Sequence, residues 1–156
     1  MSVARELVAK APSFESSQAR AVEVADAAAM VRMEEAWRER MGLARNGDPL
    51  AVLLEKEPEL RVVHARDGDT LAGFVVVDRA CKPRSFVIEL HVHPDYRRCG
   101  LGRQLLTEAL GVAAAELHCH PGNDEARCFY ERVGFLEQPK RDGGMRVMRR
   151  RRGGGL

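Results

Sequence analysis

Hydrophobic and polar residues alternate from Phe86 to His93, a pattern that predicts an extended strand. The expected faces are an apolar one with Phe86, Ile88, Leu90 and Val92, and a polar one with Glu89, His91 and His93. Pro94 and Asp95 end this strand. The period then changes, because apolar residues recur every three or four positions at Leu101, Leu105, Leu106, Ala109, Leu110 and Ala113. The centre of the chain is therefore predicted to be a strand, a short link and a helix.

Shorter elements are predicted on both sides of this unit. Before it we expect a leader over 1–18, a strand at 21–24, a helix capped by Asp26 with a stripe of Met30, Met33, Trp37 and Met41, a brief helix after Pro49, and hairpin strands at 60–65 and 70–77. After it we expect a strand at 116–120, a helix from Asn123 to about Gly134, strands at 135–137 and 145–148, and a solvated end from Arg149. The predicted order is β-α-α-β-β-β-α-β-α-β-β. We interpret 19–150 as one domain between the leader and a basic, glycine-rich tail at 151–156.

The link between the central strand and helix has the composition of an anion-binding turn. It reads Arg97-Arg98-Cys99-Gly100-Leu101-Gly102. Glycines allow positive φ and a close approach of the backbone to a ligand, and the following helix begins with unpaired amide groups at its positive end. Arg97, Arg98 and Arg103 add positive charge. A phosphate or pyrophosphate is therefore the predicted ligand.

Two sequence blocks, in their order along the chain, resemble motifs of a known family. The first is the strand, a His-Pro step and Arg97-x-x-Gly100-x-Gly102, and the second runs from Asn123 to Phe135. They resemble the acyl-CoA pyrophosphate motif, (Arg/Gln)-x-x-Gly-x-(Gly/Ala), and the next block, Asn-x-x-Ala-x-x-Phe-Tyr-Glu-x-x-Gly-Phe, of the GNAT superfamily of N-acetyltransferases. The family often has glycine where this chain has Cys99, a change that leaves main-chain donation intact.

The resemblance covers roughly 21–149 and implies a fold and an activity. The implied GNAT fold is mixed α/β, of the α+β kind, with a mostly antiparallel central sheet, a splayed parallel strand pair and flanking helices. The implied activity moves an acetyl group from acetyl-CoA to a primary amine by direct transfer in a ternary complex. The acceptor stays open among a small molecule, a peptide N-terminus and a protein lysine, with 37–46 and 140–144 expected near it. Dimers are common in the family, and the sequence leaves open whether this chain forms one.

Glu89 and Tyr130 are the catalytic candidates. Many members of the family place an acidic residue at the position of Glu89, where it accepts the amine proton directly or through water. His91 shares the same face and is an alternative base or proton relay. Tyr130 matches the family's tyrosine that protonates the thiolate of coenzyme A. The structural alternatives are a salt-bridged carboxylate and a packing tyrosine.

The resemblance also assigns contacts with acetyl-CoA. They involve the main chain at the end of the central strand, the turn and one asparagine, namely His91, Val92, His93, Arg97, Arg98, Cys99, Gly100, Leu101, Gly102, Arg103 and Asn123. In the family the main chain of this strand pairs with the pantetheine arm and polarises the thioester carbonyl. Asn123 matches the family's asparagine on that arm, and the same side chain could cap the helix that follows.

Composition limits the class of protein and the partners that we expect. A chain of 156 residues that is 45% hydrophobic and 31% charged is typical of one soluble globular domain. The net charge of +2 and an arginine run without interleaved aromatic residues give no basis for a nucleic-acid partner. We see no secretory signal and no apolar run of membrane-spanning length, and therefore expect a cytoplasmic protein with no membrane partner. The four cysteines lack paired spacing, which favours reduced thiols.

Two other functions stay open. His91 and His93, with His118, Cys119 and His120 on a neighbouring strand, could gather around a metal ion. Their spacing matches no zinc pattern, and we therefore predict no metal cofactor. A domain of the same fold could instead bind acyl-CoA or dock a partner without catalysis, although the presence of both Glu89 and Tyr130 argues for an enzyme.

Overall fold

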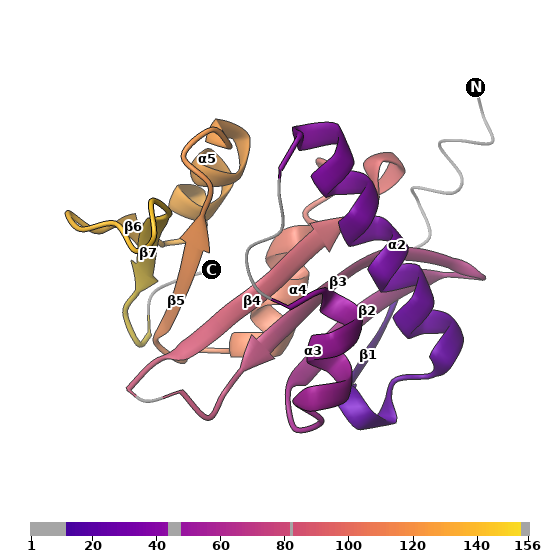
Figure 1. Cartoon of the computed structure of the whole chain (residues 1–156). Helices are drawn as coiled ribbons and strands as arrows, with labels where there is room; N and C mark the ends of the chain where they lie inside the picture. Colours follow the sequence, from indigo (N-terminus) through magenta and orange to yellow (C-terminus); the bar gives the residue numbers. More distant parts are fainter. Residues whose placement is uncertain (1–11, 44–47, 82, 154–156) are drawn as a thin grey trace.

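One seven-stranded sheet runs through the described part of the protein (Figure 1). The structure is a computed structural model that describes residues 12–43, 48–81 and 83–153. The strand order is β1-β2-β3-β4-β5-β7-β6, in which β4 and β5 are parallel and the other neighbours antiparallel. The elements are β1 (Ser13–Gln18), η1 (Ala19–Ala21), α2 (Val24–Met41), α3 (Leu50–Lys56), β2 (Arg61–Asp67), β3 (Thr70–Asp78), β4 (Ser85–Val92), η2 (Pro94–Tyr96), α4 (Leu101–Leu110), β5 (Ala115–Cys119), α5 (Asp124–Arg132), β6 (Leu136–Glu137) and β7 (Arg146–Arg150). The predicted fold class and order of helices and strands are confirmed.

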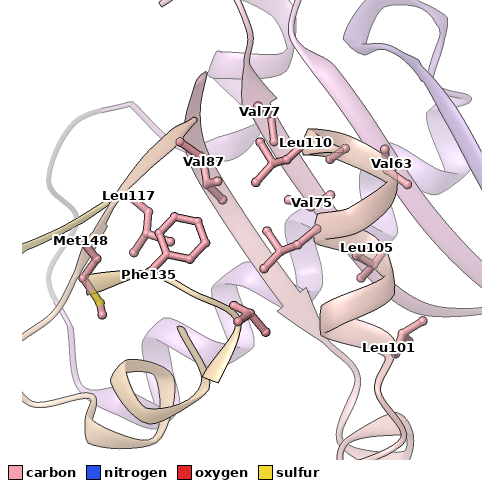
Figure 2. Packing of buried hydrophobic residues seen from close by; sticks show 14 of the residues in the cluster. Val63, Val75, Val77, Val87, Leu101, Leu105, Leu110, Leu117, Phe135 and Met148 are labelled. Atoms are coloured by element: carbon pink, nitrogen blue, oxygen red, sulfur yellow. The ribbon is translucent and has the colours of Figure 1, made fainter. Parts of the chain in front are cut away.

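The helices divide the buried side chains into two cores. In Figure 1, α2 and α3 lie in front of the sheet and α4 lies behind it. On the α4 face, the apolar stripe of the helix packs against strand residues such as Val75 and Val87, and the same core continues to Phe135 beside β5 and β7 (Figure 2). On the other face, Met30 of α2 packs in a second core with Phe74 of β3. Because β3 is buried on both faces, almost every residue in it is apolar.

The first strand lies earlier than the sequence predicted. β1 pairs along its length with β2, and Phe14 packs against the α4-side core. Six residues of the predicted leader therefore belong to the sheet, and 21–24 forms the end of η1 and the start of α2 instead of a strand. An edge strand with one large apolar residue among serines gives a weak hydrophobic signal. The prediction for 1–11 lies outside the described residues.

The predicted solvated end also begins too early. Arg149 and Arg150 belong to β7, and Arg150 is 1% exposed. Its Nη2 donates to the carbonyl oxygens of Gly111 (2.9 Å) and Ala113 (2.7 Å), which lie just after α4. Burial lowers the pKa of the Arg150 guanidinium. A run of arginines was interpreted as surface, whereas every second position of a strand faces the core.

A β-bulge interrupts the central strand. Val76 pairs with Glu89 and Val77 pairs with Val87, which leaves Ile88 without a partner in β3. Val87, Leu90 and Val92 consequently pack in the α4-side core, while Ile88 packs in the core beneath α2. The prediction that Ile88 shares a face with Leu90 is therefore wrong. The bulge is invisible in a simple alternation of apolar and polar residues.

Two expectations about the whole chain can be compared with the described residues. Among them, no helix has the length and apolarity needed to cross a membrane. The side chains of Cys81, Cys99, Cys119 and Cys128 are free thiols.

Candidate functional site

The two halves of the sheet part at the middle of β4. The parallel ladder joins Ser85 to Ala115 and ends where Val87 meets Leu117. Beyond that point β4 and β5 diverge, as Figure 1 shows, and the divergence starts next to the bulge at Ile88. A strand edge without a neighbour leaves main-chain donors and acceptors for another partner.

The register of β4 shows which main-chain groups point toward this divergence. In an antiparallel pair, residues alternate between those bonded to the neighbouring strand and those pointing away from it. The amide of His93 donates to the carbonyl oxygen of Ala72 in β3 (2.8 Å). Alternation therefore directs the main chain of His91 toward β3, and that of Leu90 and Val92 toward the β5 side. Sequence reasoning named His91 to His93 and missed Leu90.

A tyrosine that the sequence analysis did not single out anchors the turn after β4. The hydroxyl of Tyr96 donates to Asp67 Oδ2 at the end of β2 (2.6 Å). This hydrogen bond is the largest cause that raises the pKa of Tyr96 to about 12. The bond ties η2 to the β2–β3 hairpin and so fixes where the turn begins. In the sequence, only the position of Tyr96 beside the predicted anion-binding turn indicated this anchoring role.

The turn presents charge and backbone amides to solvent. Arg97, Arg98, Cys99 and Gly100 are exposed, as is Arg103 in the first turn of α4. Arg98 and Gly100 have positive φ, at 62° and 78°. Gly100 is the N-cap of α4, which has neither a side-chain cap nor an acidic residue in its first turn. The start of α4 is therefore a suitable place for an anion.

Gly102 is needed for a different reason from the one predicted. Its φ is not positive, and a Cβ there would lie 3.0 Å from Cζ of Phe129. The absence of a side chain lets α5 pack against the start of α4. The neighbouring Leu101 is 3% exposed, so that only its main chain can meet a ligand.

Glu89 and His91 form a pair on the face of the sheet that α2 covers. His91 Nε2 lies 2.6 Å from Glu89 Oε2, and the two side chains are 8% and 17% exposed. The His91 ring stacks on Phe74, with centroids 5.2 Å apart, and meets the edge of Trp37 from α2 at 5.5 Å. Aromatic contacts on both sides hold the imidazole in position for Glu89. A carboxylate and an imidazole in contact are suited to accept a proton and pass it on.

Tyr130 lies on α5 and packs with Phe129 and Phe135, whose ring centroids are 5.4 and 5.8 Å away. Burial, followed by the charges of Cys119 and Glu89, raises the pKa of its hydroxyl. The phenol therefore stays protonated at neutral pH and feels the charge of Glu89. A partly buried phenol that keeps its proton can serve as a proton donor.

Asn123 occupies the N-cap of α5. Its Oδ1 accepts a hydrogen bond from the amide of Ala126 (3.1 Å). The capping role that the sequence allowed is therefore present, and the side-chain amide nitrogen is a further donor at the same position.

A pocket of about 440 Å³ lies over β5 and β7. It is lined by Glu116, His118, Gln138, Pro139, Lys140, Arg141, Asp142, Val147 and Arg149. His118 Nε2 lies 3.8 Å from carboxylate oxygens of both Glu116 and Asp142, and its ring meets Phe86 of β4 at 5.0 Å. A second hollow, of about 510 Å³, contains none of the predicted site residues.

The histidines considered for a metal site do not come together around one ion. In the described ranges, the group of side chains with suitable ligand atoms is Glu15, Asp26 and His64. His91 instead pairs with Glu89, and His118 lies on a strand that has diverged from β4.

Comparisons with known proteins show which family the chain is similar to. Residues 26–135 match the acetyltransferase (GNAT) family. The N-alpha-acetyltransferase RimI of Mycobacterium tuberculosis is 37% identical over 84 residues, which are 50% of this chain and 53% of that protein. A mycothiol acetyltransferase of Propionibacterium freudenreichii is 35% identical over 88 residues, 51% of this chain and 28% of that protein. The matched region is thus about half or less of these relatives.

Solved structures share the fold over most of the chain. The PaiA N-acetyltransferase of Thermoplasma acidophilum, in complex with coenzyme A, has a TM-score of 0.63 at 17% identity and is covered to 99%, against 89% of this chain. A GNAT-family acetyltransferase of Staphylococcus aureus Mu50 has a TM-score of 0.70 at 14% identity, with 88% of this chain and 98% of that one covered. With the family match over more than two thirds of its residues, the chain belongs to the acetyltransferase (GNAT) family.

Proposed function

We propose that this protein transfers the acetyl group of acetyl-CoA to a primary amine in a ternary complex. The observation that carries the proposal is the Glu89–His91 pair, which lies on β4 where β4 leaves β5, one short turn before the uncapped start of α4. A proton-accepting pair and a candidate binding site for a diphosphate thus lie on one continuous segment. This arrangement suits a substrate with a diphosphate at one end and a thioester at the other.

In the proposed complex, the turn and α4 bind the pyrophosphate of acetyl-CoA. The amides at the start of α4 would donate to its oxygens, and Arg97, Arg98 and Arg103 would supply charge. The pantetheine arm would replace the missing strand beside β4 and pair with the main chain of Leu90 and Val92. The amide group of Asn123 would contact the arm from the opposite side while its oxygen caps α5.

The chemical step then uses groups on both sides of the divergence. The amine nitrogen attacks the thioester carbonyl, a C–N bond forms, and main-chain donors of β4 stabilise the charge on oxygen. The Glu89–His91 pair accepts the proton from nitrogen, which a basic amine must lose to react. The C–S bond breaks, and Tyr130 protonates the thiolate of coenzyme A. The pair and the phenol recover their original protonation through exchange with water.

We assign the acceptor to the pocket over β5 and β7. It lies on the strand that diverges from β4, and it includes Lys140 and Asp142 from the loop expected near the acceptor. Glu116 already accepts a hydrogen bond from Arg149 Nε (2.6 Å), so Asp142, beside His118, is the carboxylate that would contact an ammonium group. One relative is named an N-alpha-acetyltransferase and another a mycothiol acetyltransferase. Peptide α-amines and small amines are therefore the first acceptors to screen.

Two measurements test the proposal. Calorimetry should detect acetyl-CoA binding to the wild type and weaker binding to Arg98→Glu, which changes an exposed residue of the turn. Release of free thiol from acetyl-CoA, with α-amine peptides, lysine peptides and small amines, should reveal the acceptor. Glu89→Gln and Tyr130→Phe should each lower turnover by roughly 10²-fold or more with little change in acetyl-CoA affinity.

Glu108→Gln, on the exposed face of α4, is the matched control and should behave as the wild type. No binding of acetyl-CoA by folded protein would refute the proposal. Binding without turnover on any amine would favour a non-catalytic acyl-CoA-binding or partner-docking role. Normal turnover by Glu89→Gln or by Tyr130→Phe would remove that residue from the mechanism.

A further inference from the structure

Three potential metal ligands meet at the opposite end of the sheet from the acceptor pocket. Glu15 comes from β1, His64 from β2 and Asp26 from the first turn of α2. His64 Nε2 lies 3.1 Å from Glu15 Oε2 and 3.4 Å from Asp26 Oδ2. One ligand atom from each residue lies within 4.8 Å of the others. Residues 11, 38 and 49 positions apart in sequence are thus gathered at one point.

The imidazole of His64 is buried without a hydrogen bond. Its side chain is 2% exposed, and neither ring nitrogen has a hydrogen-bond partner among the residues that the structure describes. Nε2 is close to two carboxylate oxygens, but neither contact has the alignment of a hydrogen bond. Buried polar groups normally have partners, because an unpaired one loses its hydration without compensation. A nitrogen that faces two carboxylates in this way is suited to share an ion with them.

The spacing of the ligand atoms fits a divalent transition metal. Zinc lies about 2.0–2.2 Å from histidine nitrogen and carboxylate oxygen, which separates two ligands by about 3.4 Å in a tetrahedral arrangement. The separations of 3.1 and 3.4 Å from His64 Nε2 agree with that requirement. Three protein ligands leave a fourth position for water. A nitrogen with two carboxylates suits zinc better than magnesium or calcium, which prefer oxygen ligands alone.

The surrounding charge favours a cation. Glu15, Glu23 and Asp26 surround one guanidinium, that of Arg66, which hydrogen-bonds to Asp26 and lies 3.8 Å from Glu23. The Glu15 side chain is 66% exposed, which gives an ion access from solvent. Arg66 donates to Asp26 Oδ2, the same oxygen that faces His64, so an ion bound there would have to displace the guanidinium, which would then have Glu23 as its partner.

We propose that Glu15, Asp26 and His64 bind one zinc ion. The ion would join β1 and the start of α2 to β2, which comes much later in the sequence. The site is separate from Glu89, Tyr130 and the turn before α4, and a bound ion would cross-link elements of the fold. A bound ion would stabilise the folded chain, because it binds a site that unfolding destroys.

The test uses the full chain after treatment with a chelator. Equilibrium dialysis against Zn²⁺ should give one ion per chain, and Zn²⁺ should raise the melting temperature more than equal Mg²⁺ or Ca²⁺. Glu15→Gln should weaken zinc binding at least tenfold and suppress the rise in melting temperature. Because Glu15 is exposed, this variant should fold normally. Asp26→Asn should have the same effect on zinc binding.

Glu23→Gln is the matched control, since Glu23 is 79% exposed and near Arg66 but is not a ligand. It should bind zinc as the wild type does. Cobalt bound in place of zinc should give a visible spectrum without the charge-transfer band of a thiolate, which would separate this site from the cysteines. The proposal is overturned if no zinc binds, if Glu15→Gln binds as tightly as the wild type, if Glu23→Gln weakens binding equally, or if the cobalt spectrum contains a thiolate band.

Discussion

Gly73 is the position where one added carbon should disturb both the fold and the cofactor site. It lies on β3 opposite Val92, and α4 packs directly over it. A Cβ at this position would lie 2.9 Å from the main-chain oxygen of His91, 3.1 Å from Leu105 Cδ1 and 3.4 Å from Leu101 Cδ2. The leucine carbons can rotate away, whereas the carbonyl oxygen is fixed in the β3–β4 ladder. Gly73→Ala must therefore displace β4.

The expected loss of stability follows from two opposing effects. Alanine within a strand is ordinarily more stable than glycine by about 0.5–1 kcal/mol, because glycine loses more backbone entropy on folding. Overpacking a close-packed site costs about 1–3 kcal/mol, and a main-chain atom cannot relieve it by a rotamer change. The net destabilisation should be about 1–2 kcal/mol. For a chain of this length that lowers the melting temperature by about 2–8 °C.

The assay compares thermal unfolding with acetyl-CoA affinity. Displacement of the His91 carbonyl moves the main chain of Leu90 and Val92, so Gly73→Ala should also bind acetyl-CoA several-fold more weakly. Gly111→Ala is the control, because Gly111 has a φ of 54° and open space around it at the other end of α4. Its strained backbone should cost about 1–3 kcal/mol and leave the affinity unchanged. A fully stable Gly73→Ala variant, or equal losses of affinity in both variants, would refute the reasoning.

Three further predictions concern Tyr96, Asn123 and Arg150. The pKa of Tyr96 is raised to about 12, so that between pH about 10 and 12 the folded chain keeps a proton that the unfolded chain releases, and stability should fall with rising pH in that range. Chemical unfolding at pH 9 to 11 should show a smaller fall for Tyr96→Phe, and an equal fall would contradict this cause. Asn123→Ala should lose about 0.5–2 kcal/mol with the helix cap, whereas Asn123→Ser should keep that stability yet bind acetyl-CoA more weakly; unchanged affinity in calorimetry would limit Asn123 to capping. Arg150→Ala should lose about 1–3 kcal/mol in urea unfolding, because two carbonyl oxygens lose their donor, and wild-type stability would show that water replaces it.

Most of the fold could be predicted because its helices and inner strands have strong periodic patterns. The stripe of α4 and the hairpin around Asp67 are local signals that need no knowledge of distant residues. β1 was placed too late, since Phe14 is its main apolar residue and the strand depends on β2 for partners. Arg150 was assigned to the surface because its two carbonyl acceptors lie nearly forty residues earlier. Such long-range dependence is not recorded in a local pattern.

The candidate site was predictable to the extent that its parts are contiguous. The order of Glu89, the turn and Gly100 along the chain predicts a proton acceptor beside an anion-binding turn. The bulge at Ile88 and the direction of the Leu90 main chain could not be predicted, because they depend on the register with β3. The reason for glycine at position 102 could not be predicted either, because it is the contact with Phe129 on another helix.

The short parallel ladder between β4 and β5 has a consequence for how the domain unfolds. Among the described residues, the ladder from Ser85 to Val87 is what hydrogen-bonds the strands of the two halves, whereas the α4-side core packs against both, so β5–β7 should open locally before the whole domain unfolds. Amide hydrogens in the smaller half should exchange through its own opening, without global unfolding. A pantetheine arm bound beside β4 would add hydrogen bonds and contacts between the two halves of the sheet. Acetyl-CoA should therefore slow exchange in β5 and β7 as well as in the strand it touches.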